Sequence, residues 1–327
     1  MKEWMKALVA TGYGPPGQLS IADVPVPRPG PGQIQVRIAA ATVNPTDIRV
    51  ITGAFGDAVR LEFPYTLGTD FAGTVTEAGP GVTRYGAGDE VFGQAVPRPL
   101  RAVAAPTRPS LGTGALAEYA VFEADTPLLA HRPAGVPADQ AAALAIAGLT
   151  AQALMTTAEI RPGESVLVIG ATGGVGTTLV PLLAAARADI VATAATGAGG
   201  ELLRRLGAGR VIGVDASQYP TGIDVVFNLA LFADRVAAAA RAIRPGGRLI
   251  SIIYPAPAPE QLGRDDVDLR FVMDLEGRLG GMRGVAEAAA SGALVATIGR
   301  RYGLDEAVRA AVDYARGGTL GKIVVTM

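Results

Sequence analysis

The chain has 327 residues, of which 49 % are hydrophobic and 18 % charged, and its formal net charge is −1. This composition is globular, and no block of Lys or Arg suggests a nucleic-acid or membrane surface, so neither partner is expected. With no cysteine and a single histidine, His131, the chain excludes disulfides, thiolate nucleophiles, Cys-ligated zinc and metal sites built from several histidines. No signal peptide is visible, and we expect a cytoplasmic protein of two domains.

Short apolar runs and turns fill the first part of the chain. The apolar segment Met5–Ala10 and the alternation of Ile34, Val36 and Ile38 predict strands. Further strands are predicted in GTDFAGTVTEAG, GDEVFGQ and GALAEYAVFEAD, which are punctuated by glycines. Pro97–Gly114 contains four prolines and two glycines and predicts a long surface loop. We therefore expect an all-β, turn-rich region here.

The pattern changes after this region. RPAGVPADQAAALAIAGLTAQALMTTA is rich in helix formers and predicts a long helix. From Glu164, strand patterns (SVLVIG, DIVATAA, RVIGVD, DVVFNLA, GGRLISII) alternate with helical ones (TTLVPLLAAARA, GGELLRRLGA, ADRVAAAARAI). This alternation predicts an α/β fold with a parallel, doubly wound sheet. Two uncharged windows, 140–158 and 166–186, are expected to be buried elements rather than membrane spans, and the closing KIVVTM is expected to form a strand.

A glycine-rich turn follows the strand pattern SVLVIG and opens a helix, which is the setting of a dinucleotide site. The strict G-x-G-x-x-G spacing is not met, but glycines allow close approach of backbone N–H groups to a pyrophosphate, and the helix dipole favours its charge. A glycine-rich turn without a ligand is the alternative. The residues predicted to bind the cofactor here are Gly170, Ala171, Thr172, Gly173, Gly174, Val175 and Gly176.

The second strand pattern lacks the acidic residue that would hold the ribose 2′-hydroxyl of NAD. No Asp or Glu occurs between Asp189 and Glu201, so a 2′-phosphate is not repelled and NADP(H) is the favoured cofactor. Thr193 and Thr196 are candidate donors to that phosphate. Arg204 and Arg205 are further candidates, although a solvated helix face is the favoured interpretation of both. Asn228, in DVVFNLA, and Ile253, in GGRLISII, complete the candidate cofactor contacts.

Nine motifs in order give the chain a resemblance to a known family. They are NPTD, PYTLGTDFAGTV, GDEVFG, GALAEYAV, AIAGLTAQALM, GESVLVIGATGGVG, RLGAGRVI, IRPGGRLISI and the closing GKIVV. The chain resembles the zinc-independent medium-chain dehydrogenase/reductases, in particular the NADPH:quinone oxidoreductase branch, over nearly its whole length.

The resemblance implies a GroES-like, β-rich catalytic domain at residues 1–131, completed by about 272–327, and a Rossmann domain at 132–271, with the cofactor in the cleft between them. Zinc-dependent relatives place a Cys where this chain has Asn44, a His and a Glu where it has Thr69 and Asp70, and a further Cys near Ile146. With these positions changed and no cysteine present, a catalytic zinc is not expected, and the metal site is predicted to be absent.

The implied activity is NADPH-dependent hydride transfer, without a metal, to a quinone or another α,β-unsaturated carbonyl acceptor. The resemblance makes Asn44 and Thr150 the candidate catalytic residues, although an Asx turn before Pro45 and simple helix packing would also explain them. Asp47 and Asp70 are expected to bond turn backbone. The candidate substrate contacts are Phe55, Tyr65 and Tyr254.

Three positions depart from the family pattern. Phe55 stands where a tyrosine is usual, and Gly199 and Val214 stand where a Lys and a Tyr usually contact the 2′-phosphate. Two other functions therefore stay open: an enoyl-thioester or tailoring enoyl reductase, and a catalytically weak NADPH-binding structural or regulatory protein. The resemblance also implies a homodimer formed by Rossmann edge strands, for which GRLISIIYP (247–255) is the candidate edge.

Overall fold

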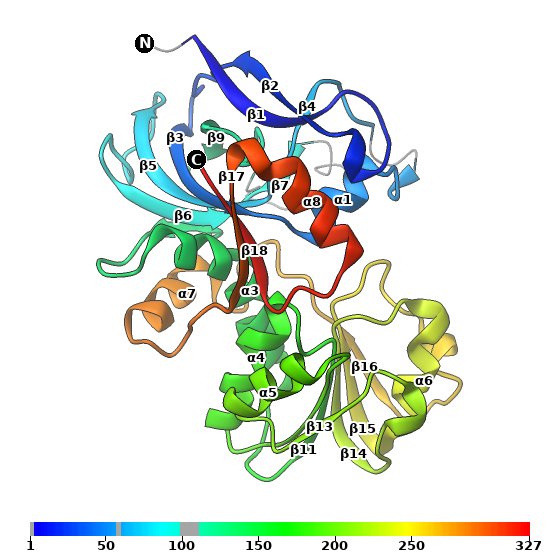
Figure 1. The fold of residues 1–327 in the computed structure, drawn as a ribbon. Helices are drawn as coiled ribbons and strands as arrows, with labels where there is room; N and C mark the ends of the chain where they lie inside the picture. Colours follow the sequence, from blue (N-terminus) through cyan, green and yellow to red (C-terminus); the bar gives the residue numbers. More distant parts are fainter. Residues whose placement is uncertain (1–2, 57–59, 99–110) are drawn as a thin grey trace. The chain divides into compact units, whose positions relative to one another are not determined.

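The computed structural model describes residues 3–56, 60–98 and 111–327 (Figure 1). The chain forms two compact units, one made of Met1–Leu149 with Leu275–Met327 and the other of Thr150–Asp274. The division falls within the long helix α3 (Ala138–Ala158) rather than at residue 131, because the two halves of this helix pack in different units. The predicted domain boundaries at 131 and 271 stay a prediction.

The first unit is built around strand β3 (Gln33–Thr42), which lies near the centre of a nine-stranded sheet (Figure 1). Ile34, Val36 and Ile38 are buried in its core, as their alternation predicted. The strand neighbours of β3 are β5 (Asp70–Ala78), β9 (Tyr119–Glu123) and β18 (Lys322–Thr326), all antiparallel to it. The last strand of the chain therefore pairs with a strand from its first part and completes the same sheet.

The remaining strands of this unit surround that centre. They are β1 (Trp4–Ala10), β2 (Ser20–Pro25), β4 (Tyr65–Thr66), β6 (Glu90–Gln94), β7 (Val96–Pro97), β8 (Leu111–Gly112), β10 (Leu129–His131) and β17 (Ile298–Gly303). The helices are α1 (Pro45–Ile51), α7 (Gly281–Ala290) and α8 (Ala307–Arg316). Residues 99–110 of the predicted surface loop lie outside the described part, and the described segments on either side of them pair as β7 and β8.

The second unit contains the predicted parallel sheet. Its six strands lie in the order β13-β12-β11-β14-β15-β16, which is the order of a doubly wound dinucleotide fold. The strands are β11 (Ser165–Ile169), β12 (Asp189–Thr193), β13 (Arg210–Ile212), β14 (Ile223–Asn228), β15 (Ile243–Ser251) and β16 (Asp268–Phe271). Its helices are α4 (Gly174–Ala185), α5 (Gly197–Arg205) and α6 (Val236–Ala242). The α/β fold class is confirmed.

The prediction that residues 247–255 form an edge of the parallel sheet is wrong. The segment 247–255 contributes to β15, and β15 pairs with β14 on one side and with β16 on the other. Four residues, Asp268–Phe271, form this last strand, which is too short and too charged to give a clear apolar pattern. The sheet therefore ends at β16, and β15 is an internal strand.

Among the residues that the structure describes, helix α3 has the length and apolar composition that would allow it to cross a membrane, and 67 % of its apolar window is buried within the protein. Core helices of globular proteins have the same composition. Near its start, the Gln140 side chain donates to the Ala296 carbonyl at 3.3 Å and accepts from the Ala296 N–H at 3.1 Å. The described packing agrees with the expectation of a buried element at 140–158.

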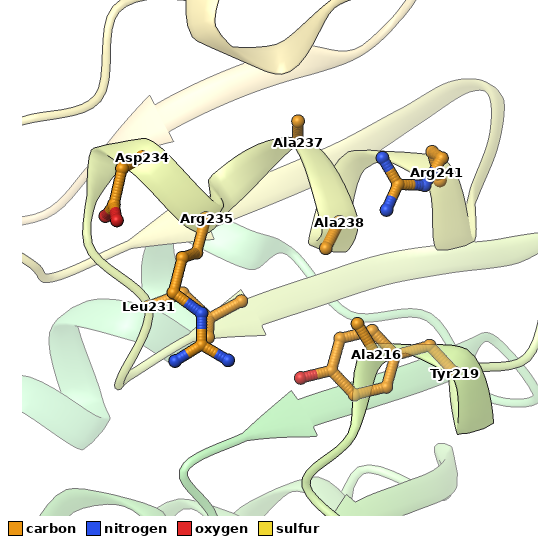
Figure 2. Close-up of a pocket in the computed structure, with 8 residues that line it drawn as sticks. All are labelled: Ala216, Tyr219, Leu231, Asp234, Arg235, Ala237, Ala238 and Arg241. Carbon is orange, nitrogen blue, oxygen red and sulfur yellow. The ribbon is translucent and has the colours of Figure 1, made fainter.

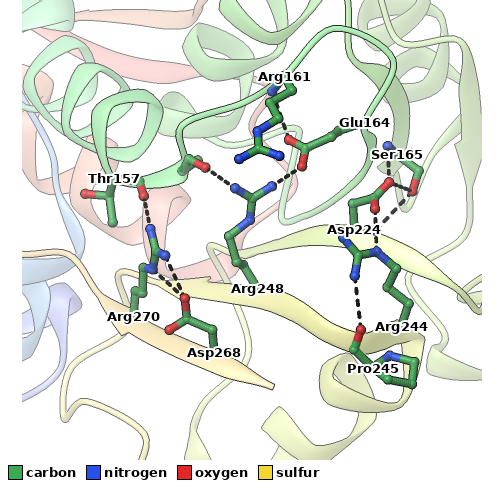
Figure 3. A network of polar contacts seen from close by, with 11 residues as sticks. Thr157, Arg161, Glu164, Ser165, Asp224, Arg244, Pro245, Arg248, Asp268 and Arg270 are labelled. Atoms are coloured by element: carbon green, nitrogen blue, oxygen red, sulfur yellow. Dashed lines mark hydrogen bonds and ion pairs between the residues drawn. The ribbon is translucent and has the colours of Figure 1, made fainter. Parts of the chain in front are cut away.

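Two arginines of the parallel sheet bind the last carbonyls of α3 (Figure 3). Arg248 donates to the Ala158 carbonyl at 2.7 Å and forms an ion pair with Glu164. Arg270 of β16 donates to the Thr157 carbonyl at 2.6 Å. Since the final carbonyls of a helix have no partner within it, these guanidinium groups satisfy acceptors that burial would otherwise leave unpaired.

Arg248→Met is expected to lower the free energy of unfolding of the second unit by about 1–3 kcal/mol, since it strands the Glu164 carboxylate and the Ala158 carbonyl. Chemical denaturation followed by circular dichroism measures this. Arg283→Met in α7 is the control, because its pair with Glu287 is exposed and spans 3.8 Å. That variant should cost less than about 0.5 kcal/mol. Equal losses for the two variants would contradict a special role of Arg248.

Candidate functional site

The glycine turn of the second unit has the geometry of a phosphate-binding loop. Gly170 follows β11 with φ +83, and Gly173 precedes the first residue of α4. A Cβ at Gly176 would lie 2.4 Å from the Ala171 carbonyl oxygen, so only glycine lets the helix approach the turn so closely. A Cβ at Gly173 would meet only the Gly170 carbonyl, at 3.5 Å, so this glycine borders space that the protein does not fill. The first N–H groups of α4 have no partner within the helix, and these residues fit a pyrophosphate.

The two threonines predicted to contact a 2′-phosphate already bond the backbone. The Thr193 hydroxyl accepts from the Gly170 N–H at 3.0 Å and lies 3.4 Å from the Val168 carbonyl. The Thr196 hydroxyl caps α5 by accepting from the Gly199 N–H at 3.1 Å. Both side chains therefore shape the edge of the sheet at which the glycine turn lies. Their contact with a phosphate stays a prediction.

Asn228 and Ile253 also lie at the carboxyl ends of the parallel strands. The Asn228 amide accepts from the Leu231 N–H at 2.7 Å and donates to the Leu231 carbonyl at 2.8 Å and to the Ser251 hydroxyl at 3.2 Å. The Ile253 N–H donates to the same Ser251 oxygen at 3.2 Å. These bonds fix the turns after β14 and β15, beside the turn after β11, and Tyr254 follows directly.

A small cavity of about 190 Å³ lies between α6 and the segment that follows β13 (Figure 2). Figure 2 shows the Arg235 guanidinium and the Tyr219 ring turned towards the same space. Arg235 comes shortly after β14, and its charge reaches Asp215, whose pKa is lowered first by the Ser217 N–H and to a smaller extent by this arginine. The cavity is lined by Ala216, Tyr219, Leu231, Asp234, Arg235, Ala237, Ala238 and Arg241.

The first unit holds a buried polar cluster at the start of α1. Asn44 precedes Pro45, the first helical residue, and both Asn44 and Asp47 are 2 % exposed. Asp47 accepts from the Asn44 N–H at 2.8 Å and from the Gly68 N–H at 3.1 Å, while the Asn44 amide donates to the Thr69 hydroxyl at 3.2 Å. The expected bond of Asp47 to turn backbone is confirmed.

Lys322, the first residue of β18, enters this cluster and was not predicted as a site residue. Its ammonium donates to Asn44 Oδ1 at 2.5 Å and to Asp70 Oδ2 at 3.2 Å, and its side chain is 8 % exposed. Asp70 is fully buried and accepts from the Thr42 N–H at 2.9 Å and from the Thr42 hydroxyl. The sequence feature that could have indicated Lys322 is a lysine at the start of the apolar strand KIVVT. The first four residues of this strand are all buried. We call Thr42, Asn44, Asp47, Thr69, Asp70 and Lys322 the lysine cluster.

Burial, and secondly the charge of Asp70, raises the pKa of Asp47 from 3.8 to about 7. The Asp47 carboxyl ionises near pH 4 in the unfolded chain but only near pH 7 in the folded protein. Its contribution to the free energy of unfolding is therefore fully present below pH 4 and is lost as the pH rises to 7. The loss is at most about 1.4 kcal/mol per pH unit.

Asp47→Asn is therefore expected to reduce the drop in the free energy of unfolding between pH 5 and pH 7. Urea denaturation at both pH values measures the difference, and Asp23→Asn, at an exposed position of β2, is the control. An unchanged drop in the Asp47 variant would contradict the raised pKa.

The candidate substrate residues fall in different places. Phe55 and Tyr65 pack against one apolar cluster with Val50 and Leu61 in the first unit. Burial raises the pKa of Tyr65, and the charge of Asp47 raises it further. Tyr254 belongs to the second unit, and Thr150 lies within α3. The structure therefore brings Phe55 and Tyr65 together, and Tyr65 lies within electrostatic reach of the lysine cluster.

Two family models match the chain. The Alcohol dehydrogenase GroES-like domain matches residues 30–133, and the Zinc-binding dehydrogenase model matches residues 206–325. In Arabidopsis thaliana, the chloroplast envelope quinone oxidoreductase homolog is 37 % identical over 64 % of this chain and 60 % of its own length. The chloroplastic NADPH-dependent alkenal/one oxidoreductase of the same plant is 32 % identical over 78 % of this chain and 64 % of its own length. The chain thus spans less than two thirds of the length of each of these two relatives.

Solved structures match over 99 % of the chain. The quinone oxidoreductase from Coxiella burnetii has a TM-score of 0.86 at 25 % identity and is covered over 99 % of its own chain. Mycobacterial Rv1454c, complexed with NADPH, has a TM-score of 0.84 at 26 % identity and is covered completely. With the GroES-like and dinucleotide-binding folds both present, the chain belongs to the medium-chain dehydrogenase/reductase superfamily, in its quinone oxidoreductase-like branch.

Proposed function

We propose that this protein transfers a hydride from NADPH, without a metal, to a quinone or another α,β-unsaturated carbonyl acceptor. The observation that carries the proposal is the glycine turn, in which Gly176 is required by close packing and Gly173 borders unfilled space at a helix N-terminus. Relatives named as quinone and alkenal/one oxidoreductases support the acceptor class.

NADP(H) is preferred in this proposal because β12 is followed by no carboxylate before Glu201, and because a structural neighbour is complexed with NADPH. Arg204 and Arg205 are in the last turn of α5. A helix that follows a parallel strand runs back across the sheet, so these two arginines lie away from the edge of the glycine turn. Arg235, which comes after the carboxyl end of β14, is at the correct edge. We propose that it supplies the positive charge for the 2′-phosphate.

Arg235→Ala is expected to weaken binding of 2′,5′-ADP about tenfold while changing the affinity for 5′-AMP less than about twofold, since a charge-assisted bond contributes roughly 1.5 kcal/mol. Calorimetry with both nucleotides measures this without turnover, and Arg204→Ala is the matched control. A similar loss for both nucleotides would show that Arg235 contacts the adenosine rather than its phosphate.

A zinc ion does not fit the residues present. Within the described ranges, no group of three or more His, Cys, Asp or Glu side chains is arranged to hold a metal. The chain contains no cysteine, and the one ammonium of the lysine cluster lies between its amide and carboxylate oxygens. The match to a model named for zinc therefore indicates ancestry of the fold, and we propose a reaction without a Lewis acid.

When bound, the nicotinamide supplies the hydride. Asn44 is held in one orientation by Lys322 and Thr69, so it presents a fixed dipole. The apolar cluster of Phe55, Tyr65 and their neighbours keeps water from an acceptor that lies against it. These residues orient and desolvate an acceptor that is already electron-poor, which is what hydride transfer without a metal needs.

The activity test is the loss of absorbance at 340 nm when purified protein receives NADPH with naphthoquinone, with an enone, or with a crotonyl thioester. Turnover with the quinone or enone supports the proposal, and a preference for the thioester would favour the enoyl reductase. Tight NADPH binding without turnover on any acceptor would favour the binding protein, which the departures at Phe55, Gly199 and Val214 motivate.

We also propose a cytoplasmic homodimer. The support is that β16 ends the parallel sheet, so its outer backbone groups have no strand partner within that sheet. Light scattering after size exclusion measures the mass. A proline at Leu269 in β16 should yield monomers if that edge forms the dimer, whereas an unchanged dimer would require another surface.

A further inference from the structure

Lys322 is an ammonium buried among oxygen atoms. Its Nζ lies 2.5 Å from the Asn44 amide oxygen and 3.2 Å from an Asp70 carboxylate oxygen, and Asp70 itself is fully buried. Its charge also lowers the pKa of Asp47, against the larger effect of burial. Amide and carboxylate oxygens that converge on one cation make an arrangement typical of a metal site, but here the cation is a side chain of the protein.

We propose that the Lys322 ammonium takes the place of a metal cation in this cluster and positions Asn44 for the reaction. The positioning of Asn44 rests on the proposed hydride transfer, whereas the replacement of a metal cation by the ammonium does not. Lys322 is a positioning residue, since it acts through the Asn44 amide.

The exclusion of a metal follows from charge and from space. A divalent cation that used Asn44 Oδ1 and Asp70 Oδ2 would have to lie within a few ångströms of the ammonium, where like charges repel strongly because water is excluded. Asp70 already accepts two bonds from Thr42, and its remaining capacity faces Lys322. The lysine therefore neutralises a carboxylate that would otherwise attract a cation.

The positioning of Asn44 follows from hydrogen-bond chemistry. An ammonium only donates, so the atom of Asn44 that faces Lys322 must be the amide oxygen. The amide nitrogen must then point towards Thr42 and Thr69, and it lies 3.3 Å and 3.2 Å from their hydroxyl oxygens. Without the ammonium, both orientations of the amide become available, and its dipole is no longer fixed.

The first experiment separates positioning from stability. It compares Lys322→Met, Asp70→Asn and the double variant with the unaltered protein for melting temperature, NADPH affinity and turnover of naphthoquinone. The double variant removes both charges, so its melting temperature should recover most of the loss seen in Lys322→Met. We expect the kcat of the double variant to stay about 100-fold below that of the unaltered protein, which is the usual effect of losing one preorganised hydrogen-bond donor. Its NADPH affinity should stay within about threefold of normal.

Recovery of both melting temperature and kcat in the double variant would overturn the positioning role, because the lysine would then only neutralise Asp70. Asp70→Asn alone should lower the melting temperature, because it leaves the Lys322 ammonium buried without its carboxylate partner. If the unaltered protein reduces none of the acceptors, the proposed function fails, and with it the positioning role. The claim that the Lys322 ammonium takes the place of a metal cation does not depend on turnover and is tested by the second experiment.

The second experiment uses zinc alone and needs no turnover. The variant N44C/T69H, which keeps Asp70 and Lys322, is compared with N44C/T69H/K322A by titration with zinc against a chromogenic chelator. We expect stoichiometric zinc uptake by the triple variant and at least tenfold weaker uptake by the double variant. Equal zinc affinity of the two folded variants would overturn the claim that the ammonium occupies the metal position, as would failure of the folded triple variant to bind. Circular dichroism establishes that each variant is folded.

Discussion

Replacing Gly176 by valine is expected to lower the affinity for NADPH at least about 100-fold, or roughly 2.7 kcal/mol of binding free energy. Any Cβ at this position would lie 2.4–2.6 Å from the Ala171 backbone, and backbone cannot move aside as a flexible side chain can. The α4 helix must therefore shift away from the turn, and the N–H groups that cradle a phosphate lose their arrangement. Fluorescence titration with NADPH measures the effect.

Gly197→Ala is the control for this prediction. It lies at the first position of α5, also follows a parallel strand, and has no atom within 4 Å of its added Cβ. Its NADPH affinity should stay within about twofold of normal, because no backbone has to move. Normal binding by the Gly176 variant would show that the turn does not hold the cofactor, and the proposed function would lose its main support.

Lys322→Met is expected to lower the free energy of unfolding of the first unit by about 3–5 kcal/mol, which is the usual result of removing one partner of a buried ion pair. The substitution leaves the Asp70 carboxylate fully buried with only its Thr42 partners and removes the acceptor role of Asn44 Oδ1. Methionine fills most of the space, so the loss is mainly electrostatic. Urea denaturation at pH 7 measures it.

Lys6→Met in β1 is the control, because its side chain is exposed and the substitution is the same. A change of less than about 0.5 kcal/mol is expected there. A loss no larger than that for the Lys322 variant would show that water reaches Asp70 and that the lysine cluster is not a low-dielectric site.

Patterns that act over a few residues predicted much of this protein. The alternation at Ile34, Val36 and Ile38 predicted β3, and the spacing of apolar runs and helix formers predicted the parallel sheet from β11 onwards. The glycines at 170, 173 and 176 predicted a tight turn, since only glycine adopts φ +83 easily or permits the backbone contact at Gly176. These features depend on local sterics and burial, which neighbouring residues specify directly.

Pairing partners were harder to predict. The edge of the sheet was placed at β15 because the four-residue β16, which lies outside it, has no distinctive pattern. The hydroxyls of Thr193 and Thr196 each accept a bond from a backbone N–H, a role that the sequence did not predict. A threonine hydroxyl can bond either the backbone or a ligand, and the residue type is the same in both cases. The sequence alone therefore did not distinguish the two roles.

The sequence by itself determined the α/β class, the glycine turn, the absence of cysteine ligands and the family to which the chain belongs. Only the tertiary structure decided that Lys322 meets Asn44, 278 positions earlier in the chain, and that Arg235 and Tyr219 line one cavity. The physical reason is that such contacts follow from strand order and register: β18 returns to pair with β3, which carries its first residue to the start of α1.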